Sequence, residues 1–149
     1  MPITLTVAEG LLAPAAEARV FAALTEALLE IEQLEGNAFM EPNVVGTLNA
    51  VPPGRVFAGG KAGAAAFVEL KLPAVALATP EAKQRFVERA TEVVERAAEG
   101  RLARDRIWVN VVYAADGAWG IAGRAYDNAG LAGAIGAAAG KSKAGSGAA

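Results

Sequence analysis

The chain has 149 residues, 54% of them hydrophobic, and a formal net charge of −2 at pH 7. This length fits one domain or two small repeats that share a core, and the weak charge argues against nucleic acid or an anionic membrane as partner. Cysteine and histidine are both missing from the sequence. Their absence excludes a disulfide framework, a thiol nucleophile, a Ser-His-Asp triad and a histidine-ligated zinc site.

The chain begins with Met1 followed by Pro2. A small second residue normally permits removal of Met1, which would leave Pro2 with a free secondary amine. Burial penalises the charged form of an amine and lowers its pKa. An amine whose pKa lies near neutrality can serve as a general base or, once protonated, as an acid. Many chains begin in this way for no functional reason, so the remaining sequence must decide.

The first third of the chain predicts a strand, a helix and a second strand. Residues 2–7 alternate in the manner of a strand. Pro14 fits the first turn of a helix, and apolar residues continue at helical spacing to about Leu34. We expect the second strand over residues 43–51, closed by a Pro-Pro-Gly turn at 52–54.

The same order of elements then recurs. Residues 67–72 are typical of a strand, Thr79 is a suitable N-cap, and Pro80 suits the first helical position. Gly100 ends the periodic apolar pattern, and residues 106–113 predict a further strand.

Aligning Pro14 with Pro80 superposes two tandem β-α-β units. A β-α-β crossover makes its two strands parallel, with the helix on one face of the sheet. We therefore predict an α/β (α+β) domain over residues 1–128, with units at 2–60 and 65–128. Its four-stranded sheet should be mainly parallel within each unit, with both helices on one face. The other face should be bare and apolar, and another copy of the protein would be its simplest cover.

Two signals remain towards the C-terminus. Asp116-Gly117 predicts a hairpin turn, and residues 119–124 would form a short returning strand. Residues 129–149 consist almost entirely of Ala, Gly, Ser and Lys. This composition favours a flexible tail, with a frayed helix as the alternative.

The Met-Pro start and the tandem β-α-β units resemble the tautomerase superfamily, and within it the cis-3-chloroacrylic acid dehalogenase group. The resemblance covers about residues 2–128. It implies a homotrimer with barrel-like sheet packing and with Pro2 at the bottom of a pocket. The strings that carry it are Met1-Pro2, Leu12-Ala13-Pro14, Pro53 to Gly60, Ile107-Trp108-Val109 and Gly123-Arg124.

The chain departs from the dehalogenases at most positions to which the resemblance assigns catalysis. Leu28 stands where they have a histidine, and Pro73 and Ala76 lie near the places of their two carboxylate-binding arginines. Asn110 replaces a tyrosine, and Ile121 replaces a water-activating glutamate. Without a base for water and a carboxylate clamp, we do not expect dehalogenation.

Five residues are our candidates for a site. Pro2 would be the catalytic base, and the planar fork of Arg124 would bind a substrate carboxylate. Lys71, Asn110 and Trp119 would bind substrate as well. Each has an ordinary alternative: a surface or intersubunit ion pair for Arg124, a solvated or paired strand face for Lys71, a satisfied core amide for Asn110, and packing for Trp119.

The leading functional hypothesis is a cytoplasmic, cofactor-independent isomerase, a tautomerase that moves a proton on a small enol or keto carboxylic acid. One alternative is a hydratase, decarboxylase or weak dehalogenase of a three-carbon acid. Another is a non-catalytic trimeric binding protein with a vestigial site. The expected partners are the small carboxylate and further copies of the chain, with no nucleic acid, membrane, cofactor or metal.

Overall fold

The computed structural model of the protein describes residues 1–145. One sheet has the strand order β2-β1-β5-β6, formed by β1 (Pro2–Ala8), β2 (Val45–Val51), β5 (Ala66–Pro73) and β6 (Ile107–Ala114). β1 runs parallel to β2, β5 runs parallel to β6, and β1 and β5 are antiparallel. This topology confirms two β-α-β units whose strands are parallel within each unit.

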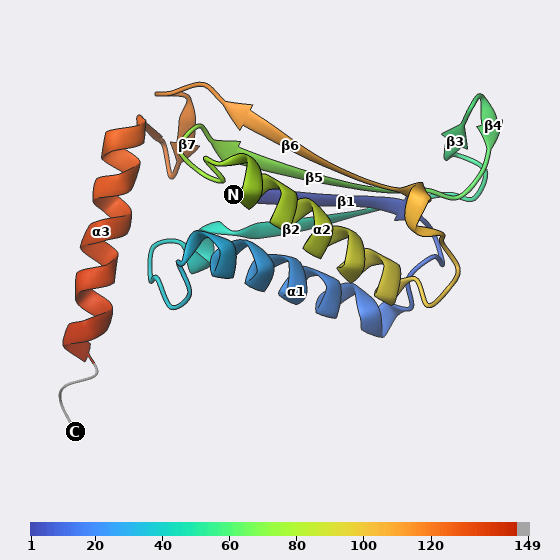
Figure 1. The fold of residues 1–149 in the computed structure, drawn as a ribbon, viewed down its shortest axis with the longest axis horizontal. Helices are drawn as coiled ribbons and strands as arrows, with labels where there is room; N and C mark the ends of the chain where they lie inside the picture. Colours follow the sequence, from blue (N-terminus) through green and yellow to red (C-terminus); the bar gives the residue numbers. More distant parts are fainter. Residues whose placement is uncertain (146–149) are drawn as a thin grey trace.

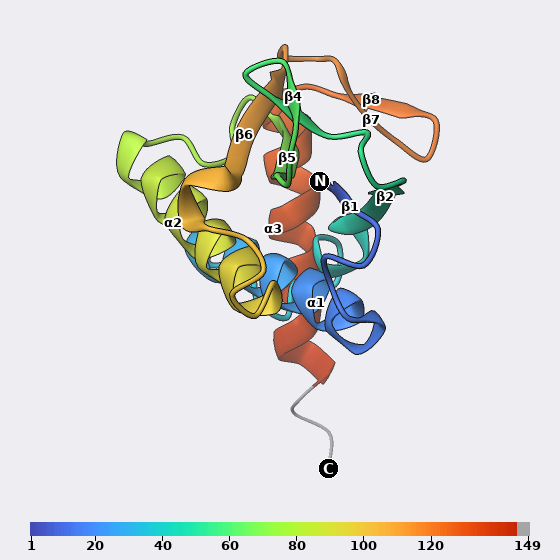
Figure 2. The same ribbon diagram turned by 90° about the vertical axis from the view of Figure 1, so that its right-hand side faces the viewer.

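Two long helices lie side by side on one face of the sheet (Figures 1 and 2). α1 (Pro14–Glu32) begins with proline at its first position and ends at Gln33, which adopts a left-handed φ of 56°. α2 (Pro80–Ala97) is capped by Thr79, whose side chain accepts a hydrogen bond from the Ala82 N–H at 3.1 Å. The proline and N-cap signals therefore mark both helix starts correctly.

The core lies between the sheet and these helices. The alternating strand pattern turns every second side chain of β1 and β5 towards the helices. Gly46 on β2 is required by close packing, because a Cβ there would lie 2.3 Å from the Phe21 ring of α1. The central buried side chains are Ile3, Leu5, Val20, Leu24, Leu28, Val68, Leu70, Leu72, Phe86 and Val94.

Short elements occupy the connections. Single turns of 3-10 helix, η1 (Glu41–Asn43) and η2 (Arg104–Arg106), lead into β2 and β6. A small hairpin of β3 (Phe57–Ala58) and β4 (Lys61–Ala62) projects from the far end of the sheet (Figure 1). None of these elements enters the main sheet.

The predicted returning strand does not return to the main sheet. β7 (Trp119–Ile121) pairs instead with β8 (Arg124–Tyr126) in a separate two-stranded sheet. Ala122 and Gly123 form the tight turn between them with φ of 50° and 80°, the sign that a two-residue hairpin turn of this kind requires.

For the tail from residue 129 the composition favours flexibility, with a frayed helix as the alternative, and the structure shows a helix, α3 (Asn128–Gly145). Alanine is the best helix former, and the Asp127 carboxylate accepts a hydrogen bond from the Gly130 N–H at 2.6 Å in the manner of an N-cap. Leu131 is only 2% exposed and anchors the helix to the body. The predictions for residues 146–149 lie outside the described part of the chain.

No helix within residues 1–145 is long and apolar enough to cross a membrane.

Candidate functional site

The N-terminal ends of β1 and β2 lie beside the C-terminal ends of β5 and β6. Because β1 and β5 are antiparallel, the start of β1 lies beside the ends of β5 and β6. Pro2 pairs with Val45 on one side, and the antiparallel register continued by one residue places Lys71 across from it on the other. Lys71 in turn pairs with Val112. These four side chains form a row across the sheet, on the face opposite the helices.

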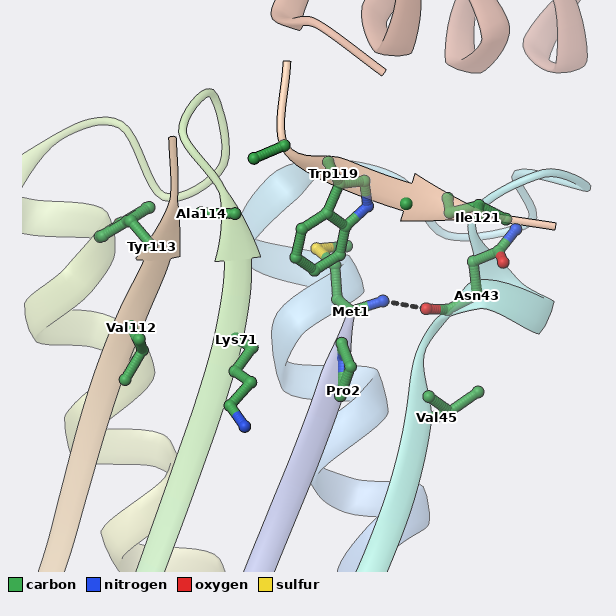
Figure 3. Close-up of a pocket in the computed structure, with 12 residues that line it drawn as sticks. Met1, Pro2, Asn43, Val45, Lys71, Val112, Tyr113, Ala114, Trp119 and Ile121 are labelled. Atoms are coloured by element: carbon green, nitrogen blue, oxygen red, sulfur yellow. Dashed lines mark hydrogen bonds between the residues drawn. The ribbon is translucent and has the colours of Figure 1, made fainter. Parts of the chain in front are cut away.

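The β7 strand lies over this row and creates a pocket of about 420 Å³ (Figure 3). Trp119 and Ile121 form much of its wall, and Gly120 between them adds no side chain. Most of the lining is apolar. The lining residues are Met1, Pro2, Asn43, Val45, Lys71, Val112, Tyr113, Ala114, Ala118, Trp119, Gly120 and Ile121.

The terminal amine of the chain lies in this pocket. Met1 is 4% exposed, and its N–H donates to the backbone carbonyl of Asn43 (Figure 3). Burial lowers the pKa of the Met1 amine from its ordinary value of 8.0 to about 6, because the charged form loses hydration. If Met1 is removed, Pro2 becomes the terminal amine beside the space that the Met1 side chain fills.

Lys71 is the one charged side chain lining the pocket in the described part of the chain. Its Nζ lies 3.1 Å from Oε1 of Glu69, two residues earlier on the same face of β5. The side chains of this pair are about half exposed. The structure thus brings Lys71 and Trp119 into one pocket with Pro2, and it gives Lys71 an acidic neighbour.

The open face of the sheet is not uniformly apolar, which corrects the sequence prediction. A second hollow of about 500 Å³ continues along it from Lys71 and is mainly polar. At one end of this hollow, the ring of Phe67 stacks on that of Trp108 with the centroids 5.6 Å apart. Strand alternation predicts which side chains share this face but not whether the face is polar, since threonine is favoured in strands at exposed and covered positions alike. The second hollow is lined by Thr4, Thr6, Asn49, Phe67, Val68, Glu69, Lys71 and Asn110.

Asn110 and Arg124 lie outside the pocket of their own chain. Asn110 pairs with Glu69 one row further along the sheet and lines the second hollow. Arg124 is exposed on β8, with its guanidinium carbon 4.6 Å from the centroid of the Tyr126 ring. Neither side chain therefore joins Pro2 within one subunit.

Sequence reasoning missed several pocket residues. Val45 and Val112 enter the site only through strand pairing, which the register could have shown. Asn43 contributes a backbone carbonyl and has no sequence signal.

Tyr113 also lines the pocket, but its ring is directed away from Pro2 (Figure 3). Its hydroxyl donates to the Leu77 carbonyl at 3.2 Å. Burial, followed by the nearby charge of Glu32, raises the pKa of Tyr113. The hydroxyl is thus engaged outside the pocket.

Among the described residues, no group of three His, Cys, Asp or Glu side chains is placed to hold a metal ion.

No protein-family model matches the chain, and no curated protein matches it in sequence. Solved structures do match it. N1, a member of the cis-3-chloroacrylic acid dehalogenase family, has a TM-score of 0.74 at 18% identity, over 89% of this chain and 88% of its own. A symmetric trimer of fused 4-OT gives 0.72 at 17% identity, over 88% and 98%. Macrophage migration inhibitory factor from Toxoplasma gondii gives 0.67 at 13% identity, over 85% and 100%.

These neighbours are tautomerase superfamily proteins, and the chain has their fold. The resemblance found in the sequence, to the superfamily and within it to the cis-3-chloroacrylic acid dehalogenase group, is thereby confirmed at the level of the fold.

Proposed function

We propose that the protein is a cofactor-independent tautomerase that uses Pro2, freed by removal of Met1, as its acid–base group. The observation that carries this proposal is the terminal amine, which lies in an apolar pocket where burial lowers its pKa to about 6 while Met1 is present. The Pro2 nitrogen would occupy the same enclosure, so we expect its pKa to be lowered as well. A neutral amine at physiological pH can accept a proton.

The proposed reaction needs no further reactant. The neutral Pro2 nitrogen removes the proton from an enol hydroxyl, and the electron pair of that O–H bond forms the carbonyl. The carbon–carbon double bond of the enol then takes the proton back from the prolyl ammonium at the neighbouring carbon. The amine is regenerated, and positioned acid–base catalysis of this kind contributes about 10²–10⁴-fold to the rate.

Lys71 would hold the substrate carboxylate. It lies across from Pro2 and is cationic, and it would take the role of the two arginines that the resemblance to the dehalogenases implies and this chain lacks. Its charge would stabilise the enolate as negative charge develops. Removal of this charge by Lys71→Met should raise KM for the enol acid by about tenfold, the effect of losing one charge-assisted hydrogen bond. An unchanged KM would assign carboxylate binding to another residue.

We further propose that the protein acts as a homotrimer. The fused 4-OT neighbours are trimers, and β2 and β6 form the two edges of the main sheet, with no further strand of residues 1–145 paired to either. Val45 and Val112, on these edges, are 50% and 43% exposed. Because Arg124 and Asn110 lie outside the pocket of their own chain, any contact they make with substrate would cross a subunit boundary.

The test is an ultraviolet assay of the ketonisation of phenylenolpyruvate and 2-hydroxymuconate, with wild type and Pro2→Ala measured side by side. Turnover that falls by at least about a hundredfold in Pro2→Ala would establish the prolyl base. No turnover would refute the tautomerase assignment for these substrates and favour a binding protein, and equal turnover in both proteins would refute the role of Pro2. Intact mass must first show that Met1 has been removed.

A covalent probe gives an independent test. The neighbour Pt0534 is inactivated by 2-oxo-3-pentynoate, and we expect this electrophile to label the Pro2 amine here. Labelling should be faster than that of a peptide with the same first residues, and peptide mass mapping should place the adduct on Pro2. Labelling at the peptide rate would indicate an ordinary terminus.

A further inference from the structure

We propose that Glu69 is a specificity-determining residue that makes the pocket favour monocarboxylates with an apolar remainder over dicarboxylates. This inference rests on the proposed function in one respect: it concerns the same pocket. It does not require the pocket to catalyse a reaction. The ligand class follows from the charges and surfaces that surround Pro2.

Glu69 lies beside Lys71 and lines the second hollow. Glu69 and Lys71 project from the same face of β5, since they are two residues apart on one strand. Lys71 lines the Pro2 pocket and the second hollow, whereas Glu69 lines only the second hollow. The carboxylate of Glu69 thus holds the ammonium of Lys71 from the side away from Pro2, at 3.1 Å.

The positive charge that the pocket offers to a ligand depends on the ion pair between Lys71 and Glu69. Glu69 offsets much of the field of Lys71, so the site presents less than one full positive charge. Two other basic side chains at this end of the sheet are engaged with aromatic rings: Lys83 lies 5.4 Å from the centroid of Tyr113, and Arg124 lies 4.6 Å from that of Tyr126. One ligand carboxylate can share Lys71, and a second would find no further cationic side chain among the described residues lining the pocket.

The part of the ligand that does not contact Lys71 would lie against apolar side chains. Val45, Val112, Trp119 and Ile121 bound the pocket. A second carboxylate placed among them would lose hydration without gaining a partner. Along the sheet it would instead approach the carboxylate of Glu69, and two like charges repel each other. A second carboxylate is therefore disfavoured in both positions, whereas an apolar or aromatic substituent meets neither the loss of hydration nor the repulsion.

The experiment compares hexanoate with adipate, which have equal chain length and carry one and two carboxylates. Trp119 lies in the pocket, and the chain has only one other tryptophan, Trp108 in the distant aromatic stack. A Trp108→Phe background therefore makes Trp119 the only tryptophan. Quenching of its fluorescence reports binding directly, in protein shown by mass to lack Met1.

We expect hexanoate to bind more tightly than adipate, and Glu69→Gln to strengthen adipate binding by about three- to tenfold relative to hexanoate at low salt. The gain should shrink at about 0.5 M salt. Glu95→Gln is the matched control, because Glu95 pairs with Arg104 on the exposed side of α2. It should leave the adipate-to-hexanoate ratio unchanged.

Adipate binding at least as tightly as hexanoate in the wild type would overturn the proposal, as would an unchanged ratio in Glu69→Gln or no quenching by either ligand. Because binding is measured without turnover, the expected ratio can be found in a protein that ketonises no enol. That result would refute the proposed function and leave the selectivity established.

Discussion

The terminal amine should titrate close to neutral pH, and this can be measured without knowing the substrate. In protein that retains Met1, burial lowers the pKa of the amine from 8.0 to about 6. At pH 7 about nine-tenths of such amines are neutral, against about one-tenth for an ordinary terminus, so the neutral fraction is roughly tenfold larger. Protein of this form can be prepared with methionine aminopeptidase inhibited during expression.

The assay is the rate of labelling by a small amine-selective electrophile between about pH 5 and pH 9, because only the neutral amine reacts. Intact mass distinguishes the forms with and without Met1, and a peptide of the same first residues provides the reference. We expect an inflection near 6 for the Met1 form, and for the Pro2 form an inflection below that of a free prolyl peptide.

A matched variant tests the cause of the shift. Trp119 forms part of the wall that covers the terminus (Figure 3). Trp119→Ala should admit water and move the inflection back towards that of the peptide. Wild-type inflections equal to those of the peptides would refute the argument that burial tunes this amine.

Three further predictions concern stability. Gly46→Ala should destabilise the protein by about 1–3 kcal/mol in urea unfolding, since the added carbon would lie 2.3 Å from the Phe21 ring; an unchanged midpoint would mean that the ring moves freely. Glu32 accepts a hydrogen bond from the Leu77 N–H at 2.8 Å, and Glu32→Ala should cost about 1–3 kcal/mol. Burial raises the pKa of the Glu32 carboxyl above its ordinary value, so the protonated carboxyl stabilises the folded state. This stabilisation is complete at pH values below the ordinary pKa and is lost as the pH rises through the raised pKa. Wild type should thus lose stability relative to Glu32→Gln as the pH rises from the ordinary pKa of 4.5 through the raised one, and a constant difference would contradict this sign. Leu131→Ala should release α3 locally, seen as faster amide exchange confined to that helix, whereas global unfolding would show that α3 is integral to the core.

The sequence predicted the fold because several signals agreed. Strand alternation, prolines at helix starts and the repeat all required two β-α-β units. It indicates α3 only as an alternative to a flexible tail, because composition alone does not show that Asp127 and Leu131 act through their positions. One side chain caps the helix, and the other anchors it.

Prediction of the candidate site was less complete. Alternation shows that Lys71 and Asn110 share a face of the sheet, but only the register shows that Lys71 lies beside Pro2 and Asn110 one row further on. The place of Arg124 depends on the pairing of β7 with β8, which the sequence pattern did not indicate.

The two halves of the sheet follow the same plan, but a chain has only one start. The first strand of the second unit enters through an ordinary peptide bond at Ala66, and an amide nitrogen has no basic lone pair. Chains of a single unit would offer one amine for every unit, whereas this chain offers one for every two. The corresponding end of the second unit is thus released from acid–base chemistry. It carries the stacked rings of Phe67 and Trp108, which are free to evolve as a packing surface, while the proposed proton transfer would be confined to the other end.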